Sequence, residues 1–202
     1  MTDGTKPSAP AVEARDISLR RGGRTIVAGV TFAVNPGDLY LLHGPNGSGK
    51  TTLLRALAGF SRPACGSLKR AVGRTILLGY ADAVKAAFTA KENIDFWGAL
   101  YGAAPATVER AISQLRIFPF LNQRTGTLSS GQRRRLALCR VVISRRPIWL
   151  LDEPTAGMDA ASVAAAVDLI AGHCRSGGSA VVATHEALPF AGARTITLAD
   201  AA

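Results

Sequence analysis

The chain has 202 residues, of which 48% are hydrophobic and 19% are charged, and its formal net charge is +10. This length allows one domain with a substantial core and excludes two full-sized domains, while the composition argues against extended disorder. Arg, Gly, Asp or Ser interrupts every long apolar stretch, which excludes a membrane-spanning helix. The positive charge would attract nucleic acid, an anionic membrane surface or a nucleotide, but arginine runs are as often only a solvated basic face.

Residues 1–10 are small, polar and proline-containing, and we expect a loose tail there rather than a signal peptide or a folded element. The three cysteines are far apart and fit no metal or redox spacing. This pattern indicates buried or incidental thiols in a reducing compartment, at Cys65, Cys139 and Cys174.

The first part of the chain predicts short strands and tight turns. Partly alternating apolar residues predict strands over 12–19 and 30–34, and the sequence NPGD at 35–38 predicts a turn. A short apolar run then predicts a buried strand over 39–42. Helical spacing of leucines follows from Lys50, and Gly59 is well placed at the C-terminal end of that helix.

Helical patterns replace strands in the middle of the chain, so residues 83–146 are the candidate helical subdomain. Pro105 suits the first position of a helix, and Ser129 or Ser130 can cap another helix that runs toward Ile143. The last part predicts a strand over 148–151, a helix over 160–171, a strand over 179–183 and a final edge strand over 195–198.

Strands that alternate with helices predict a parallel sheet with helices on its faces. We therefore expect an α/β fold with a mainly parallel sheet, antiparallel edge strands and an inserted helical subdomain. A single domain would extend over 11–202, and its core would comprise 11–82 and 147–202.

The segment that follows the predicted strand over 39–42 reads GPNGSGKT and fits the phosphate-loop pattern G-x-x-x-x-G-K-[ST]. Its glycines let backbone N–H groups converge on phosphate oxygens, and the dipole of the following helix favours negative charge there. Lys50 should reach the β- and γ-phosphates, and the Thr51 hydroxyl should ligate Mg²⁺. The segment therefore predicts a nucleotide-binding site.

An acidic pair ends the apolar strand predicted over 148–151. Asp152 is placed to meet Mg²⁺ at the carboxyl edge of a parallel sheet. Neighbouring strand residues face opposite ways, so we expect Glu153 to point elsewhere and to polarise a water molecule. A helix cap or a solvated turn is the alternative for such a pair.

Five motifs occur in the order and spacing of an ATP-binding cassette (ABC) ATPase: the phosphate loop, LSSGQ at 128–132, LLDEP at 150–154, AGMD at 156–159 and TH at 184–185. The resemblance extends over almost the whole chain from about Val12. It implies a P-loop NTPase fold of the ABC type, ATP and Mg²⁺ as cofactors, and a homodimer in which two copies close around ATP.

The same resemblance implies roles for individual residues. Glu153 would be the catalytic glutamate, His185 the switch histidine that senses the γ-phosphate, and Asp152 the Walker B aspartate that binds metal with Thr51. The Walker A loop would hold ATP through Gly44, Pro45, Asn46, Gly47, Ser48, Gly49, Lys50, Thr51 and Thr52. Nucleotide held by the opposite subunit would meet the signature residues Ser129, Ser130, Gly131 and Gln132 and the D-loop residue Asp159.

Two positions depart from the ABC pattern. Many ABC ATPases place an aromatic ring against adenine where this chain has Arg20, Arg21 and Gly22; the guanidinium plane of Arg21 could stack on the base instead. No Q-loop glutamine follows the strand expected over 75–78, and Tyr80 or Asp82 is the candidate to replace it.

The stretch from Gly79 to Lys85, with its continuation TAKENIDFW over 89–97, resembles the cytochrome c biogenesis haem-exporter ATP-binding subunits, the CcmA family. Tyr80 stands where that family usually has histidine. The resemblance implies integral membrane permease partners contacted through residues 80–97. It also implies a place on the cytoplasmic face of the bacterial inner membrane and a role in haem export or release of a holo-haem chaperone.

Two alternatives remain open from the sequence, and a third conflicts with it. The chain could be the ATPase subunit of an exporter for another substrate. It could be a soluble ABC ATPase acting on nucleic acid or ribosomes, which the charge favours, but such proteins call for two cassettes or long coiled-coil insertions and we expect no nucleic acid partner. A nucleotide binder without activity conflicts with the presence of Lys50, Asp152, Glu153 and His185 together.

Overall fold

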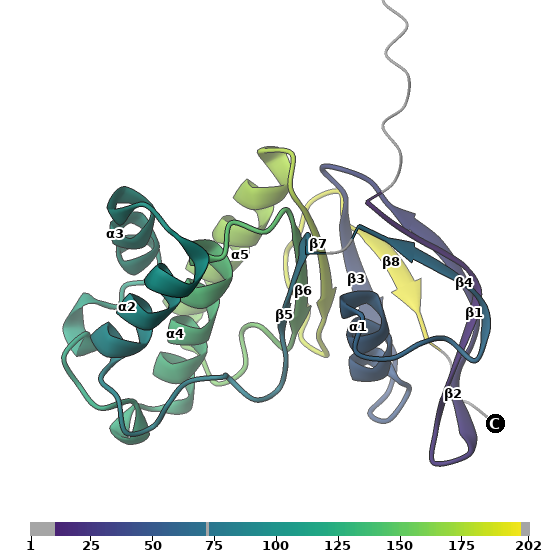
Figure 1. Cartoon of the computed structure of the whole chain (residues 1–202), viewed down its shortest axis with the longest axis horizontal. Coiled ribbons are helices and arrows are strands. Elements are labelled where there is room, and N and C mark those ends of the chain that lie inside the picture. Colours follow the sequence, from purple (N-terminus) through teal and green to yellow (C-terminus); the bar gives the residue numbers. More distant parts are fainter. Residues whose placement is uncertain (1–10, 72, 199–202) are drawn as a thin grey trace, which may run out of the picture.

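A parallel sheet of five strands lies at the centre of the fold (Figure 1). The computed structural model describes residues 11–71 and 73–198, so the tail expected over 1–10 lies outside the described residues. The strand order is β5–β6–β7–β3–β8, and every neighbouring pair is parallel. The strands are β3 (Leu39–His43), β5 (Thr75–Leu78), β6 (Ile148–Asp152), β7 (Ser179–Ala183) and β8 (Arg194–Thr197).

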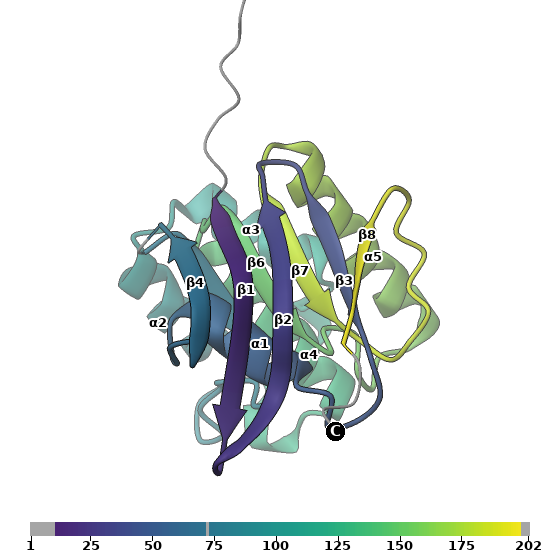
Figure 2. The same cartoon turned by 90° about the vertical axis from the view of Figure 1, so that its right-hand side faces the viewer.

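The antiparallel strands form a separate sheet of order β2–β1–β4, seen face-on in Figure 2. These strands are β1 (Val12–Arg21), β2 (Arg24–Val34) and β4 (Cys65–Arg70). Helix α1 (Lys50–Ala58) lies between this sheet and the parallel sheet and contacts both (Figure 1). The expected antiparallel strands therefore exist, but they cover α1 rather than extend the parallel sheet.

The remaining helices cover the opposite face of the parallel sheet. Helices α4 (Ser130–Ile143) and α5 (Ala160–Arg175) contact its strands, whereas α2 (Ala90–Tyr101) and α3 (Pro105–Gln114) pack on α4 farther out (Figure 1). Two short 3-10 turns, Phe118–Phe120 and Thr125–Thr127, connect α3 to α4. No helix in the described part of the chain is long and apolar enough to cross a membrane.

Strand alternation divides the interior into two cores. Ile148 and Leu150 of β6 pack on the side of α1 and the antiparallel sheet, whereas Trp149 and Leu151 pack on the side of α4 and α5. All five residues of β6 are buried, as expected for a central strand covered on both faces. The two cores fix the carboxyl ends of the parallel strands, where the phosphate loop, Asp152 and His185 lie.

Local sequence signals explain the helix ends. Ser129 caps α4 in a capping box with Gln132, and Thr89 caps α2 in the same way with Glu92. Gly59 ends α1 in the left-handed conformation, and Pro105 begins α3. Helix α5 runs to Arg175, beyond the expected end at residue 171, and β4 was not predicted at all.

Candidate active site

The motifs meet at the carboxyl edge of three neighbouring parallel strands, in the order β6–β7–β3. The phosphate loop follows β3, Asp152 ends β6, and His185 comes two residues after β7. A cavity of about 390 Å³ opens there. Its lining consists of Arg21, Ile26, Asn46, Gly47, Gly49, Lys50, Thr51, Thr52, Tyr80, Asp152, Glu153 and His185.

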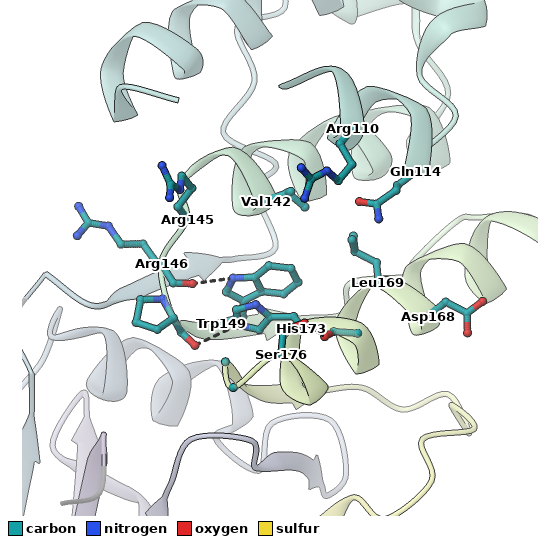
Figure 3. Close-up of a pocket in the computed structure, with 14 residues that line it drawn as sticks. Arg110, Gln114, Val142, Arg145, Arg146, Trp149, Asp168, Leu169, His173 and Ser176 are labelled. Carbon is teal, nitrogen blue, oxygen red and sulfur yellow. Dashed lines mark hydrogen bonds between the residues drawn. The ribbon is translucent and has the colours of Figure 1, made fainter. Parts of the chain in front are cut away.

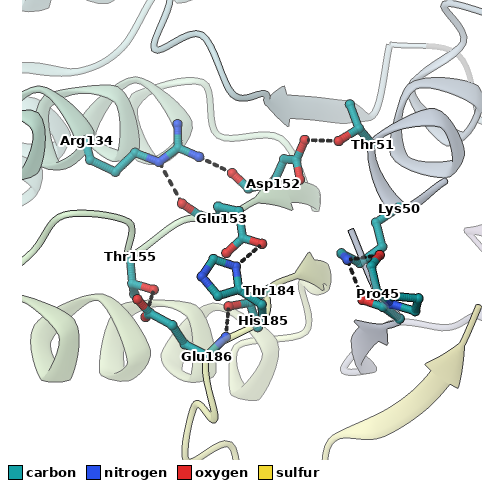
Figure 4. A network of polar contacts seen from close by, with 11 residues as sticks. Pro45, Lys50, Thr51, Arg134, Asp152, Glu153, Thr155, Thr184, His185 and Glu186 are labelled. Atoms are coloured by element: carbon teal, nitrogen blue, oxygen red, sulfur yellow. Dashed lines mark hydrogen bonds and ion pairs between the residues drawn. The ribbon is translucent and has the colours of Figure 1, made fainter. Parts of the chain in front are cut away.

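The phosphate loop folds over the start of α1. Gly49 caps the helix at φ 96°, a left-handed conformation that favours glycine, and the first turn then presents its free N–H groups to the loop. The Lys50 ammonium is buried and donates to the carbonyl oxygens of Gly44 at 2.6 Å and Pro45 at 3.0 Å (Figure 4). Both bonds are of the kind that phosphate oxygens can replace.

Thr51 and Asp152 contact each other in the wall of the cavity. The Thr51 hydroxyl donates to Asp152 Oδ2 at 2.6 Å, a contact between residues 101 positions apart (Figure 4). Burial raises the pKa of the Asp152 carboxyl, and the bond from Thr51 partly offsets that rise. A hydroxyl and a carboxylate oxygen this close form a partial ligand set of the hard oxygen type that Mg²⁺ prefers.

Glu153 and His185 form the second pair in the cavity. Glu153 Oε1 lies 2.9 Å from His185 Nδ1, and the Glu153 side chain is 18% exposed against 66% for His185 (Figure 4). Thr184, just before it, is buried and accepts a hydrogen bond from the Glu186 N–H. A carboxylate that is mostly buried and oriented by an imidazole can accept a proton from water.

The direction of Glu153 has a different cause from the one predicted. Strand alternation does not set it, because β6 ends at Asp152 and Glu153 has φ 49°. A left-handed backbone at a residue other than glycine costs of order 1–3 kcal/mol, and such strain persists only where the surroundings enforce it. The Glu153 N–H donates to Ala183 O at 2.8 Å, which holds the strained residue against the end of β7.

Arg134 is the site residue that sequence reasoning missed. An arginine run such as Arg133 to Arg135 predicts a solvated basic face, yet the Arg134 side chain is only 5% exposed. It contacts the backbone of both Asp152 and Glu153 (Figure 4), and it pairs with Asp82. Helical spacing could have revealed it, since Arg134 falls three residues after Gly131 and four before Leu138, and both are buried.

The signature residues lie apart from the cavity that holds Lys50. Ser129 and Gln132 are used in the capping box of α4, and Ser130 is exposed beside a smaller cavity with Tyr80 and Arg134. Asp159 caps α5 through its bond from the Ser162 N–H at 2.7 Å, and this bond lowers the pKa of its carboxyl. In the described part of the chain, these residues line no surface of the Lys50 cavity.

The residues at the two positions that depart from the ABC pattern have distinct surroundings. Arg21 lines the cavity together with Thr51 and Thr52, so it can reach a base attached to phosphates held by the loop. Tyr80 lines the same cavity and is 86% exposed, whereas Asp82 turns toward Arg134. The two candidates for the missing Q-loop glutamine therefore have different contacts.

A larger cavity of about 520 Å³ lies elsewhere, between α3, the end of α4 and α5 (Figure 3). Its floor is Trp149 stacked on His173, with ring centroids 3.8 Å apart and planes 7° apart. His173 Nε2 lies 3.0 Å from Pro147 O, and burial lowers the pKa of the imidazole. These residues precede or flank the amino end of β6, far from the phosphate loop, which fits a packing role for His173.

Known proteins are similar to this chain in sequence and in fold. A model of the ABC transporter family matches residues 27–156. A cytochrome c biogenesis ATP-binding export protein CcmA from Rhodospirillum rubrum is 42% identical over 95% of this chain and 88% of its own. Its counterpart in Rhodobacter capsulatus is 40% identical over 91% of this chain and 85% of its own. The chain belongs to the CcmA family of ABC transporter ATP-binding proteins.

The CcmA family assignment agrees with the fold of solved structures. A putative ABC transporter ATP-binding protein from Pyrococcus furiosus superposes with a TM-score of 0.82, covering 93% of this chain and 96% of its own at 23% identity. At that identity the similarity shows the fold alone. As a member of the CcmA family, the chain is an ABC-type ATPase, and the expected recognition and fold class are confirmed.

Proposed function

We propose that this chain hydrolyses ATP for a membrane complex of cytochrome c biogenesis, and that the hydrolysis drives haem export or the release of a haem chaperone. The observation that carries the proposal is the convergence of two pairs on one cavity, Thr51 with Asp152 and Glu153 with His185. CcmA relatives at about 40% identity over most of the chain support the choice of pathway.

The phosphate loop binds the triphosphate. Lys50 exchanges its two carbonyl partners for oxygens of the β- and γ-phosphates, and the N–H groups at the start of α1 complete the contacts. The side chains of Thr51 and Asp152 would hold Mg²⁺, which would neutralise negative charge on the triphosphate. Arg21 stacks on the base and takes the place of the usual aromatic ring.

Glu153 acts as the general base. Its carboxylate accepts a proton from a water molecule as the water oxygen bonds to the γ-phosphorus, and the bond from phosphorus to the β-phosphate oxygen breaks, so ADP leaves. His185 orients that carboxylate through the 2.9 Å contact and, being largely exposed, is free to meet the γ-phosphate. Both roles require the residues to stay at the edge of one cavity.

A second copy of the chain completes the site. Ser129, Ser130, Gly131, Gln132 and Asp159 lie outside the Lys50 cavity of their own chain, and the exposed Ser130 and Asp159 are available to nucleotide bound by the partner copy. In this homodimer, ATP joins the two copies, and loss of the γ-phosphate removes the charge that held them together. A single copy would therefore hydrolyse ATP poorly.

The permease subunits dock on the apolar surface of Phe88, Phe96 and Leu100, at the start and along one side of α2. These side chains are exposed, and Lys85 lies over the rings of Phe88 and Phe96 at 5.0 and 4.8 Å. Large exposed apolar side chains that gather in one place indicate an interaction surface. Docking there places the chain peripherally on the cytoplasmic face of the inner membrane.

Recovery of the tagged chain from membranes tests this function. We expect the native chain to copurify with integral membrane proteins, and the double variant Phe96→Asp with Leu100→Asp to lose them. Phe60→Asp is the matched control, because Phe60 is also an exposed ring but follows α1 on the other side of the fold. Recovery of ribosomes or RNA without any membrane protein would favour the soluble alternative and contradict the proposal.

A further inference from the structure

We infer that Arg134 is a positioning residue for ATP hydrolysis, which fixes the Asp152–Glu153 backbone so that the Glu153 carboxylate faces His185, with Asp82 as its anchor. The inference rests on the proposed role of Glu153 as the base. It deepens that role, because it names what holds the base in place.

Arg134 makes contacts with two separate strand ends. Its Nε donates to Glu153 O at 2.9 Å, and Nη2 donates to Asp152 O. Its Nη1 donates to Gly79 O at 2.8 Å and to Asp82 Oδ1 at 2.8 Å. The guanidinium from α4 thus joins the end of β6 to the segment that follows β5; Figure 4 shows its contacts with the end of β6.

These contacts determine the backbone conformation at the base. Glu153 has a left-handed φ of 49°, and its carbonyl and the carbonyl before it are both held by one guanidinium. The Ala183 carbonyl holds its N–H from the other side. Without the guanidinium the peptide can rotate toward an ordinary extended conformation, which would turn the carboxylate away from His185. Only a planar fork of donors can satisfy both carbonyls at once.

Asp82 holds the Arg134 guanidinium in position through an ion pair. Arg134 is buried, and Asp82 is the carboxylate that pairs with it, so removal of Asp82 would leave the charge held by carbonyl dipoles alone. Asp82 lies in the segment 79–89 between β5 and α2, next to Tyr80 in the cavity wall. Of the two candidates for the missing Q-loop glutamine, Asp82 is therefore the one that acts on the base, through Arg134.

Steady-state hydrolysis by the full chain, together with binding of a fluorescent ATP analogue, tests the inference. Arg134→Gln should lower kcat by about tenfold or more while the Kd for nucleotide stays within about threefold, because the base is displaced and the phosphate loop is not. Arg134→Lys should recover only part of the loss. Asp82→Asn should lower kcat less than Arg134→Gln.

Arg140→Gln is the matched control. Arg140 lies on the same helix and donates to a strand carbonyl, Leu77 O, away from Glu153, so kcat should stay within about twofold. Guanidinium ion at tens of millimolar should raise turnover of Arg134→Ala, whereas equal sodium chloride should not. A purely structural role would give no such rescue.

The outcomes separate the two ideas. If Glu153→Gln is inactive but folded Arg134→Gln keeps the native kcat, the positioning role is wrong and the base assignment stands. Folded Arg134→Ala with low kcat and no response to guanidinium also overturns the positioning role. If Glu153→Gln turns over normally, the proposed base is wrong and the inference about Arg134 is lost with it.

Discussion

Gly131 of the signature motif has a packing requirement inside its own chain. A methyl group built on Gly131 would lie 3.1 Å from Gly157 C and 3.2 Å from Met158 Cα, and closer still to Gly157 O. Gly157 has φ 72° and belongs to the turn before Asp159, so the obstacle is backbone rather than a flexible side chain. Gly131→Ala must therefore push the start of α4 away from this turn.

The cost of that substitution follows from two opposing effects. Overpacking costs about 1–3 kcal/mol, and replacement of a helical glycine by alanine returns about 0.5–1 kcal/mol. We expect a net loss of stability of about 1 kcal/mol, which lowers Tm by about 2–4 °C in a chain of this size. Because the shift also moves Ser130 and Asp159, kcat should fall by about tenfold or more.

Thermal unfolding followed by circular dichroism and steady-state ATP hydrolysis measure the two effects. Gly98→Ala is the matched control, since a methyl on Gly98 within α2 would meet Val108 Cγ2 at an ordinary 3.7 Å. That variant should be stabilised by about 0.4–1 kcal/mol and keep native turnover. If Gly131→Ala gained stability like Gly98→Ala and kept its kcat, the packing account of the signature glycine would be refuted.

Two further predictions use the pKa shifts. Burial raises the pKa of Cys139 to about 12 and that of Cys174 to about 11, whereas Cys65 is exposed. A thiol reagent at pH 8 should therefore label Cys65 alone in the native chain and all three cysteines in denaturant. Fast labelling of Cys139 in the native chain would contradict its burial. Burial lowers the pKa of His173 in the folded chain, so protonation of this imidazole favours the unfolded chain. The free energy of unfolding should therefore fall as the pH drops below about 6.5, and this group contributes at most about 1.4 kcal/mol per pH unit to the loss. His173→Phe keeps a ring on Trp149, and urea titrations at pH 7 and pH 5 should show a smaller loss for this variant; an equal loss would exclude His173 as the source.

Local sequence signals predicted much of the fold because the physics at those positions is local. The capping box at Ser129, the proline that begins α3 and the glycine that ends α1 each act within one helical turn. The strand β4 was missed because its residues are mostly exposed and its pairing with β1, about 50 positions earlier, leaves no alternating pattern.

Sequence motifs are enough to select the candidate site residues where residue type and spacing indicate the chemistry, as at Lys50 and the Asp152–Glu153 pair. They are not enough where contacts between residues far apart in the sequence determine burial or orientation. The burial of Arg134 depends on Gly79 and Asp82, more than 50 positions away, and a run of three arginines gives no sign of which one turns inward. The orientation of Glu153 depends on a left-handed backbone that strand periodicity cannot predict.

Turnover and assembly of Glu153→Gln test the central claim most directly, namely that Glu153 is the base of an ATPase that works as two copies. Removal of a general base costs about 10²–10⁴-fold in rate, so hydrolysis should nearly disappear. Nucleotide binding should persist, and size-exclusion chromatography with ATP should show an accumulated dimer. Native turnover of this variant would contradict the assignment of Glu153, and a monomer that still binds ATP tightly would contradict the shared site.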